Sequence, residues 1–308
     1  MYKNLGESII QYTDQSKSVV VLVAPFVKVN VIAKILEAIS PEILLKIVTR
    51  WIPEEIVAGV NDLEIWKLLK KRPNSSLYLC QNLHAKYYRF DDKCLIGSAN
   101  LTAQALGFKK RSNLELLLPY SSDNSSLVEF EDALFSQSIL VNELIYSEYL
   151  ELVEKLKQDI PEIIIQIEEP DVFQQDNFWL PSLRNPEEFY LAYSGQNNRL
   201  TTVARELGKK ELDSFKIPKG LSKDTFNLYI SLFIKQTEIV KYIDSNLDNP
   251  RRFGEVRRLI QNLLNQDNIN ADASYTWQTL MRWLLYFLPD RYSYKVFNYS
   301  EIFYRNQE

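Results

Sequence analysis

The run S-V-V-V-L-V-A-P-F over residues 18–26 is the feature that most narrows the folds open to this chain. A continuous apolar, β-branched segment that ends at a proline predicts a strand buried on both faces. Helical spacing follows over residues 29–39, and a second apolar strand is expected over 43–49. This alternation favours an α/β layer domain.

The same alternation continues to about residue 160. Asp91-Asp92 separates two short apolar segments and predicts a hairpin turn. The further elements that we expect are a helix from Pro53 that restarts near Asn61, strands over 77–80, 84–90, 93–96 and 114–119, and mostly helix over 127–157. The sequence therefore predicts a mixed sheet flanked by helices.

Beyond about residue 160 the pattern changes to that of a mostly α-helical domain. Residues 161–167 suit one last strand, and residues 168–177 are polar and suit a linker. Helices are then expected from Asn185 and over 201–215, 223–246, 252–265 and 275–288. We therefore expect two domains, a catalytic domain over residues 1–165 and an accessory domain over residues 166–308.

The composition favours a cytoplasmic protein without a membrane partner. No apolar run approaches the roughly 20 residues of a membrane span, and the first residues lack the layout of a signal peptide. Two cysteines, Cys80 and Cys94, cannot build a disulfide framework and suit small buried positions on strands.

One stretch gathers the residues that carry chemistry. Residues 82–102 contain His84, the only histidine of the chain. On a strand, side chains two apart share a face, so His84 and Lys86 are expected to point the same way. The hairpin then returns the chain to G-S-A-N over 97–100, where small residues permit close approach to a ligand, and Ser98 and Asn100 offer hydrogen-bond donors.

An imidazole, an ammonium group and neutral donors around one point suit a phosphodiester substrate. The imidazole can act as nucleophile or acid/base, the ammonium can bind the non-bridging oxygens, and the donors can stabilise growing negative charge. One histidine and two separated cysteines do not suit a zinc site, and no carboxylate cluster suits two magnesium ions. We therefore expect neither a metal nor another cofactor.

The spacing His84-X-Lys86-X4-Asp91, followed by Gly97-Ser98-X-Asn100, resembles the HKD signature of the phospholipase D superfamily. The flanking Ala24-Pro25-Phe26, Arg50 and Asn113-Leu-Glu115 resemble its single-motif bacterial nucleases and restriction enzymes. The resemblance covers about residues 15–120 and fails beyond about 160. It implies a phospholipase D-like mixed sheet.

The resemblance also implies roles for the matched residues. His84 would attack phosphorus and form a phosphohistidine, while Lys86 and Asn100 would bind the phosphate oxygens, with Ser98 beside them. Glu115 would accept a hydrogen bond from the imidazole and fix its tautomer. Asp91 would shape the turn, and Gly97 would be structural. Arg50 would either add positive charge near the site or lie at the surface.

The lone histidine makes a prediction about quaternary structure. In-line displacement needs a nucleophile and also an acid for the leaving oxygen, and one imidazole cannot do both at once. Members of the family place two HKD motifs face to face, in one chain or across a dimer. We therefore expect a homodimer through the catalytic domain, with His84 of each subunit in one shared site.

Positive charge surrounds the motif. Residues 67–111 hold ten Lys or Arg and two Asp, a local charge of +8, whereas residues 115–159 hold ten acids and two Lys, a local charge of −8. The basic block, with Lys109, Lys110 and Arg111 at its end, suits an anionic substrate. Solvated helix faces that alternate in sign would give the same counts.

Four arginines, Arg251, Arg252, Arg257 and Arg258, stand at one predicted helix start. They suit phosphate contacts with nucleic acid, and equally a solvated helix face that pairs with nearby acids. The many aromatic residues over 277–304 favour a helical core or a dimer interface over a base-stacking platform. The accessory domain is expected to bind nucleic acid or a protein partner.

Three functions are compatible with these residues. A metal-independent nuclease that acts on DNA, in restriction or antiviral defence, is favoured. A phospholipase D or transphosphatidylase would share the chemistry, but the chain lacks an obvious membrane-binding helix, and lipid enzymes of the family usually carry both motifs. A catalytically silent binding module is disfavoured, because His84, Lys86, Asn100 and Glu115 are all retained.

Overall fold

The computed structural model describes residues 4–160, 179–215, 217–297 and 300–306 of the chain. The chain forms two compact units, Met1–Gln166 and Ile167–Glu308. The predicted strand over 161–167, the predicted linker over 168–177 and the predicted boundary after residue 165 lie outside the described residues.

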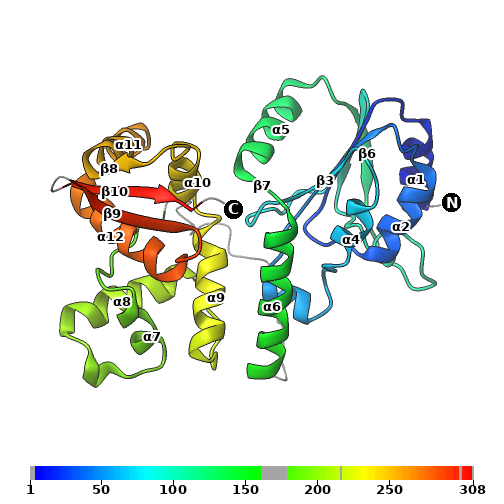
Figure 1. Cartoon of the computed structure of the whole chain (residues 1–308). Coiled ribbons are helices and arrows are strands. Elements are labelled where there is room, and N and C mark those ends of the chain that lie inside the picture. The colour runs from blue at the N-terminus through cyan, green and yellow to red at the C-terminus, as the bar shows by residue number, and fades with distance from the viewer. Residues whose placement is uncertain (1–3, 161–178, 216, 298–299, 307–308) are drawn as a thin grey trace. The chain divides into compact units, whose positions relative to one another are not determined.

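The N-terminal unit is built on a seven-stranded mixed sheet of order β6-β5-β4-β1-β2-β3-β7 (Figure 1). The strands β1, β2 and β3 are parallel to one another. The other pairs are antiparallel: β4 pairs with β1, β5 with β4, β6 with β5, and β7 with β3. The strands are β1 Val19–Val23, β2 Leu44–Thr49, β3 Ser75–Leu79, β4 Tyr87–Phe90, β5 Lys93–Gly97, β6 Leu117–Ser121 and β7 Ile139–Leu140.

The position of each strand follows from its residues. β1 lies at the centre, where its run from Val20 to Val23 is fully buried, as an apolar segment without alternation requires. β6 lies at an edge and contains Pro119, which cannot donate to a further strand. The most apolar strand is thus covered on both faces, and the proline-containing strand pairs on one side only.

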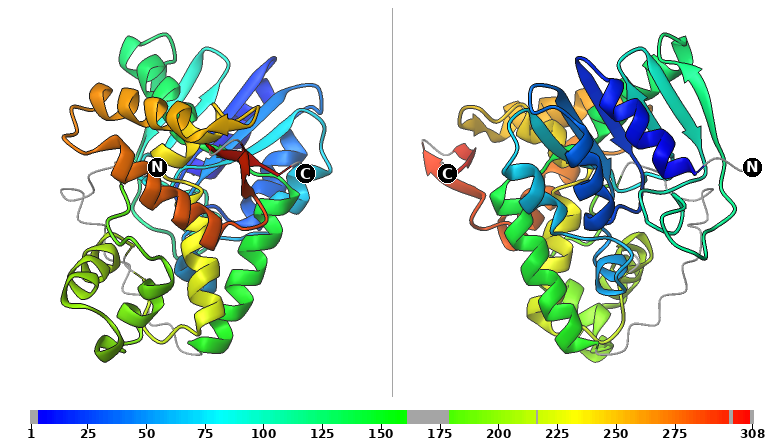
Figure 2. Two further views of the ribbon diagram at one scale, coloured as in Figure 1. Left: turned by 60° about the vertical axis from the view of Figure 1, so that its left-hand side comes forward. Right: turned by 90° about the vertical axis from the view of Figure 1, so that its right-hand side faces the viewer.

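Helices cover both faces of this sheet (Figure 2). On one face α1 and α2 pack together, and Tyr12 of α1 stacks on Phe90 of β4 at 5.4 Å between ring centroids. On the other face Phe130 of α5 contacts Tyr87 of β4 at 5.6 Å. Tyr87 and Phe90 are three positions apart on one strand, so their side chains point to opposite faces. The helices are α1 Leu5–Gln15, α2 Val29–Ala38, α3 Pro53–Val57, α4 Ile65–Lys70, α5 Ser125–Gln137 and α6 Glu143–Asp159.

Three details of the N-terminal unit differ from the sequence prediction. Helix α1 was not predicted. The segment 127–157, predicted as mostly helix, is divided between α5 and α6 by the short strand β7, which pairs with β3. Strand β4 begins at Tyr87 and not at His84, so His84 and Lys86 lie in the loop before it. Their arrangement is therefore set by loop contacts and not by strand alternation.

The C-terminal unit is mostly helical, as predicted, but also contains a three-stranded sheet of order β8-β10-β9 that was not predicted. The helices are α7 Glu187–Tyr193, the 3₁₀ turn η1 Asn197–Arg199, α8 Thr202–Phe215, α9 Lys223–Ile234, α10 Glu238–Asp244, α11 Phe253–Gln266 and α12 Ala273–Phe287. The strands are β8 Arg251–Arg252, β9 Tyr292–Phe297 and β10 Ser300–Arg305.

Aromatic side chains form the core of the C-terminal unit. Trp283 of α12 is fully buried, packs at 5.2 Å from Phe189, and donates from Nε1 to the carbonyl of Leu183 at 2.7 Å. Trp277 of the same helix packs at 5.0 Å against Phe303 of β10. Trp277, Trp283 and Phe303 are therefore core, whereas Tyr294 and Phe297 of the same segment are exposed, and the sequence left a core and a dimer interface open for this segment.

The predicted fold class is confirmed, a mixed α/β sheet flanked by helices followed by a mostly helical region. Both cysteines are buried and carry free thiols. None of the helices in the described part of the chain has the length and apolar character of a membrane span.

Candidate active site

His84, Lys86, Ser98 and Asn100 lie at the edge of the sheet where the parallel strands end, whereas Asp91 lies in the turn at the other end of the hairpin of β4 and β5. β1, β2 and β3 run in one direction, so their carboxyl ends share this edge. β4 runs antiparallel to β1 and begins there, directly after His84 and Lys86, and β5 returns to the same edge and ends at Gly97. In open α/β sheets, ligands bind at this end of the parallel strands.

A cavity of about 600 Å³ opens beside His84 at this edge. Its polar lining comes from His84, Lys86 and Ser98, and part of its apolar wall comes from Leu127 and Phe130 of α5. His84 and Ser98 are exposed, and Lys86 is half-buried. The fold therefore brings an imidazole, an ammonium group and a hydroxyl to one solvent-accessible hollow.

Gly97 is required by the packing of β5 against the segment that leads into β6. A Cβ atom at this position would lie 1.8 Å from the carbonyl oxygen of Leu116, which no side chain tolerates. The N–H of Gly97 donates to the carbonyl of Lys86 at 3.2 Å, so the end of β5 is tied to the loop that carries the ammonium group. We predicted that small residues at 97–100 allow a ligand to approach the backbone. At Gly97 the neighbour that approaches is instead the backbone of Leu116.

Ser98 and Glu115 form a hydrogen-bonded pair at the cavity. Ser98 Oγ donates to Glu115 Oε2 at 2.5 Å and accepts from the N–H of Leu116 at 3.1 Å. The other carboxylate oxygen accepts from the side-chain amide of Asn113 at 3.1 Å. Both oxygens of Glu115 are therefore held in place beside Ser98, and its bond to the imidazole of His84 stays a prediction.

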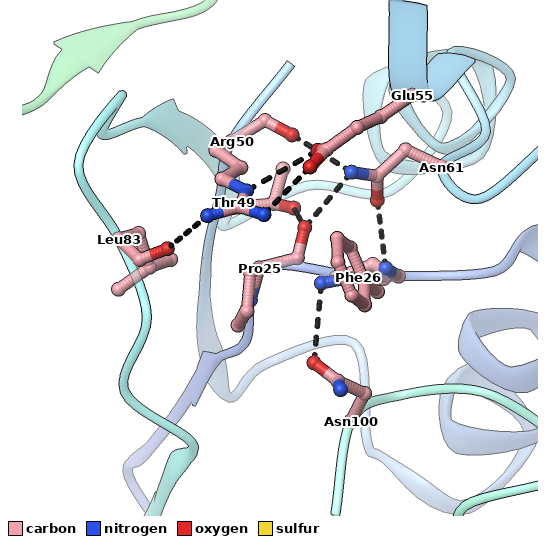
Figure 3. A network of polar contacts seen from close by, with 9 residues as sticks. Pro25, Phe26, Thr49, Arg50, Glu55, Asn61, Leu83 and Asn100 are labelled. Carbon is pink, nitrogen blue, oxygen red and sulfur yellow. Dashed lines mark hydrogen bonds and ion pairs between the residues drawn. The ribbon is translucent and has the colours of Figure 1, made fainter. Parts of the chain in front are cut away.

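Asn100 reaches the loop that follows β1. Its Oδ1 accepts from the N–H of Phe26 at 3.3 Å (Figure 3). The N–H of Leu101 donates to the carbonyl of Phe26 at 3.1 Å, which holds the same two loops together. Because the oxygen of Asn100 is engaged, its NH₂ group is the part left to donate, and a donor suits an anionic oxygen.

Arg50 does not lie at the surface, which was the second of its two predicted environments. It is 4% exposed, and its guanidinium forms a two-point pair with Glu55, Nη2 to Oε1 at 2.6 Å and Nε to Oε2 at 3.2 Å (Figure 3). Burial raises the pKa of Glu55, and the bonds from Arg50 partly offset that rise. A guanidinium enclosed in this way stabilises the loops around it, and a role of Arg50 in substrate binding stays a prediction.

The structural role extends to the loop that carries His84. Nη1 of Arg50 donates to the carbonyl of Leu83 at 3.2 Å, and the guanidinium lies 5.1 Å from the ring centroid of Phe26. Asn61 donates to the carbonyls of Arg50 and Pro25, both at 2.8 Å. We call this buried cluster the Arg50 network, comprising Pro25, Phe26, Thr49, Arg50, Glu55, Asn61 and Leu83. It ties together the loops after β1 and β2 and the loop before β4.

Asp91 anchors the turn of the hairpin of β4 and β5, at the end away from the cavity. It has a positive φ of 54°, which Asp tolerates better than most residues. Its carboxylate accepts from the N–H groups of Lys17, Ser18 and Val19 at 2.7, 2.9 and 2.9 Å, and from Ser18 Oγ at 2.6 Å. Partial burial raises the pKa of Asp91, but these bonds outweigh it and lower the pKa to about 2. These are the contacts that a structural role in the turn requires.

The other predicted substrate-binding residues divide between the two units. Lys109, Lys110 and Arg111 are exposed in the connection between β5 and β6, which also carries Asn100 and Glu115. In the C-terminal unit, Arg251 is half-buried and donates from Nε to the carbonyl of Asn246 at 2.7 Å. The side chains of Arg252, Arg257 and Arg258 are exposed.

Several residues of the site escaped the sequence analysis. Leu127 and Phe130 line the cavity, and Glu55 pairs with Arg50. The spacing of Leu127 and Phe130 indicates one face of a helix, but not what that face covers. The five-residue spacing of Arg50 and Glu55, across the helix start at Pro53, is the only signal that could have suggested their pairing.

Solved structures with a similar fold were found, whereas no family model and no curated protein matches the chain. NucT from Helicobacter pylori is 18% identical, with 47% of this chain and 86% of that chain covered and a TM-score of 0.33. Nuc from Salmonella typhimurium, a phospholipase D family member, is 16% identical, with 44% and 90% covered and a TM-score of 0.36. The phosphatidylserine synthase of Haemophilus influenzae is 16% identical, with 50% and 41% covered and a TM-score of 0.38.

All three TM-scores lie below 0.5. The motif at His84 lies at the carboxyl edge of a mixed sheet, with Lys86, Ser98 and Asn100 in the neighbouring loops. The N-terminal unit is a mixed α/β domain, and the motif that it carries at this edge resembles the HKD signature of the phospholipase D superfamily.

Proposed function

We propose that the protein is a phosphodiesterase that hydrolyses DNA through a phosphohistidine formed on His84. The observation that carries the proposal is the cavity of about 600 Å³ that joins the only imidazole of the chain to Lys86 and Ser98. The resemblance of the motif and its flanks to bacterial nucleases and restriction enzymes supports DNA as the substrate and a role in restriction or antiviral defence.

The chemistry proceeds in two displacements at phosphorus. An imidazole nitrogen of His84 attacks, a P–N bond forms, the P–O bond to the leaving group breaks, and the leaving oxygen takes a proton from a general acid. A water oxygen then attacks, the P–N bond breaks, and a general base takes the proton of the water. Lys86 and the NH₂ group of Asn100 bind the non-bridging oxygens in both steps.

The general acid and base in this proposal is the imidazole of a second copy. The chain has one histidine, and His84 is exposed, so a second copy can reach it. The edge strand β6 and the residue before it expose Leu116, Leu118 and Tyr120 by 51%, 45% and 52%, next to the Gly97 end of β5. An exposed apolar edge beside the site supports a homodimer interface there.

A lipid substrate is the second candidate, and the apolar wall of the cavity favours it. Ile96, Leu127 and Phe130 can contact either an acyl chain or the face of a nucleobase. The phosphodiester chemistry at His84 is the same for both substrates. The two candidates are therefore separated by substrate and not by mechanism.

The test is cleavage in excess EDTA of supercoiled plasmid, single-stranded DNA, RNA and phosphatidylcholine vesicles. We expect cleavage of DNA that His84→Ala abolishes, because no second group in the chain can replace the imidazole. Asn82→Ala, an exposed residue of the same loop, serves as the control and should retain activity. Lipid turnover without DNA cleavage would establish the second candidate, and no turnover of any substrate would contradict both.

The shared site is tested by mixing subunits. Wild-type protein is exchanged with increasing His84→Ala protein, and cleavage is measured per wild-type subunit. If two imidazoles act in one site, that rate falls toward zero as mixed dimers replace wild-type dimers. A rate per wild-type subunit that stays constant would show that each subunit acts alone.

A further inference from the structure

The last part of the C-terminal unit has the element order of a winged helix-turn-helix domain. Helix α10 is followed by the short strand β8, the helices α11 and α12, and the hairpin of β9 and β10. β10 lies between β8 and β9 and is antiparallel to both. In Figure 2, left view, α11 and α12 are drawn in orange tones and the hairpin in red.

These elements share one apolar core. Val256 and Ile260 of α11 are fully buried, as is Leu280 of α12. Trp277 of α12 packs at 6.4 Å against Phe253 and at 5.0 Å against Phe303 of the hairpin. The core fixes α11, α12 and the hairpin together, so the exposed residues of these elements keep fixed positions relative to one another.

Apart from Glu255, the outward face of α11 is basic or neutral along its length. Arg252, Arg257 and Arg258 are exposed and line a shallow groove together with Gly254, Glu255 and Ser300 of β10. The one acid between residues 251 and 266, Glu255, accepts the N–H of Arg252 at 2.7 Å and caps the helix. The remaining exposed side chains of the helix are Gln261, Asn262, Asn265 and Gln266.

Helix α12 also leaves a polar stripe uncovered near its start. Tyr275 is 46% exposed, and Gln278, about one turn further on, is exposed as well. Lys295 of β9 is exposed on the hairpin. In helix-turn-helix proteins, the second helix enters the major groove with its first residues on base edges, while the helix before it crosses the phosphate backbone.

We propose that this surface binds double-stranded DNA. The start of α12 enters the major groove, where Gln278 and Tyr275 reach base edges, because the groove is about as wide as one helix. Arg252, Arg257 and Arg258 contact the phosphates, and Lys295 on the hairpin contacts the backbone beside them. The exposed arginines are complementary in charge to a polyanion. A helix that presents Gln and Tyr near its start fits a major groove, so the polyanion that we propose is duplex DNA.

The inference goes beyond the proposed cleavage, since it assigns duplex recognition to the C-terminal unit whatever happens at His84.

The test uses the full chain with His84→Ala, so that binding is measured without cleavage. Fluorescence anisotropy with a labelled duplex of about 20 base pairs and mixed sequence gives affinity at several salt concentrations. Arg257→Ala with Arg258→Ala should weaken binding at least about tenfold and lower the slope of log K against log salt by about 2, one for each lost phosphate contact. The matched control, Lys209→Ala with Lys210→Ala on exposed positions of α8, should leave both unchanged.

A second pair tests the recognition helix. Tyr275→Ala with Gln278→Ala should reduce the preference for duplexes selected from a random pool over unselected ones, without changing the salt slope. The inference is overturned if the parent protein does not bind duplex DNA, or if it prefers a single strand or an RNA duplex. It is also overturned if the arginine and lysine pairs have equal effects. Cleavage by the protein that retains His84 is measured separately, so failure of one proposal leaves the other distinguishable.

Discussion

The cavity beside His84 and the Arg50 network lie at the same edge of one sheet but use their polar groups in opposite ways. In the network, Arg50, Glu55 and Asn61 are buried and bond to one another or to backbone carbonyls. In the cavity, His84 and Ser98 are exposed to solvent. The difference teaches that a charged residue near a motif can act on the loops that hold it instead of on the substrate.

The largest expected effect comes from breaking the buried pair. Arg50→Met leaves the carboxylate of Glu55 buried without its partner, which should lower the free energy of unfolding by about 3–5 kcal/mol. Urea denaturation followed by Trp fluorescence measures this change. A decrease in the free energy of unfolding below about 1 kcal/mol would mean that the pair behaves like a surface ion pair. It would contradict the distinction between the buried network and the exposed cavity.

The double variant Arg50→Met with Glu55→Met sharpens the same comparison. Replacing both partners by apolar groups of similar size should restore most of the lost stability. The carbonyl of Leu83 still lacks its donor, so we expect kcat for cleavage to remain below that of the wild-type protein. Full recovery of stability and kcat together would show that the network does not position the loop of His84.

The second effect concerns the cavity alone. Lys86→Ala should lower kcat for cleavage about 10²–10³-fold, because one donor to the phosphate oxygens is lost. The free energy of unfolding should change by about 0.5 kcal/mol or less. Lys93→Ala removes an exposed lysine at the opposite end of the hairpin and should retain full activity. An equal decrease of kcat in the Lys86→Ala and Lys93→Ala variants would indicate a general effect of positive charge. It would contradict a specific role for the lysine of the cavity.

The smallest effect tests the anchor of the hairpin and depends on pH. Asp91→Asn removes the charge that accepts four hydrogen bonds, and should lower the free energy of unfolding by about 1 kcal/mol, since solvent weakens bonds to a partly exposed carboxylate. The folded pKa of about 2 lies below the ordinary value of 3.8, so this stabilisation is present above about pH 4 and is lost as pH falls toward 2.

The comparison for this variant is Asp92→Asn, one residue further along the same turn. Asp92 is exposed, and its substitution should change stability little at any pH. Urea denaturation at pH 7, 4 and 3 measures both variants. A difference between wild type and Asp91→Asn that does not shrink with falling pH would contradict the assigned pKa.

Much of the N-terminal sheet could be predicted because its strands are strongly patterned. The run at Val20 could only be a central strand, and Asp91-Asp92 marked the hairpin. Helix α1 was missed because Gly6 weakens its helical signal, although Gly6 packs directly against the ring of Phe108 and is favoured there by space. That reason lies in a residue about a hundred positions away.

Candidate residues for the site could be selected from the sequence, but their contacts could not. The spacing of the motif indicated His84, Lys86, Ser98 and Asn100, and Arg50 was singled out beside them. Whether Arg50 faces solvent or Glu55 depends on how two loops pack, and local sequence does not record this. The hairpin of β9 and β10 was missed for a similar reason, because its aromatic residues fit a buried helix as well as a strand.

The bonds from Asp91 to residues 17–19 join parts of the chain 72 to 74 positions apart. Contacts between residues so distant in sequence form slowly, because closing the long loop costs conformational entropy before the contacts stabilise the fold. The hairpin can close its own turn early, yet it reaches its final position only when it meets the start of β1. If β1 separates from β4, the chain still contains every residue of the motif, but these residues no longer form the site. Catalytic activity therefore reports on the assembly of the whole sheet.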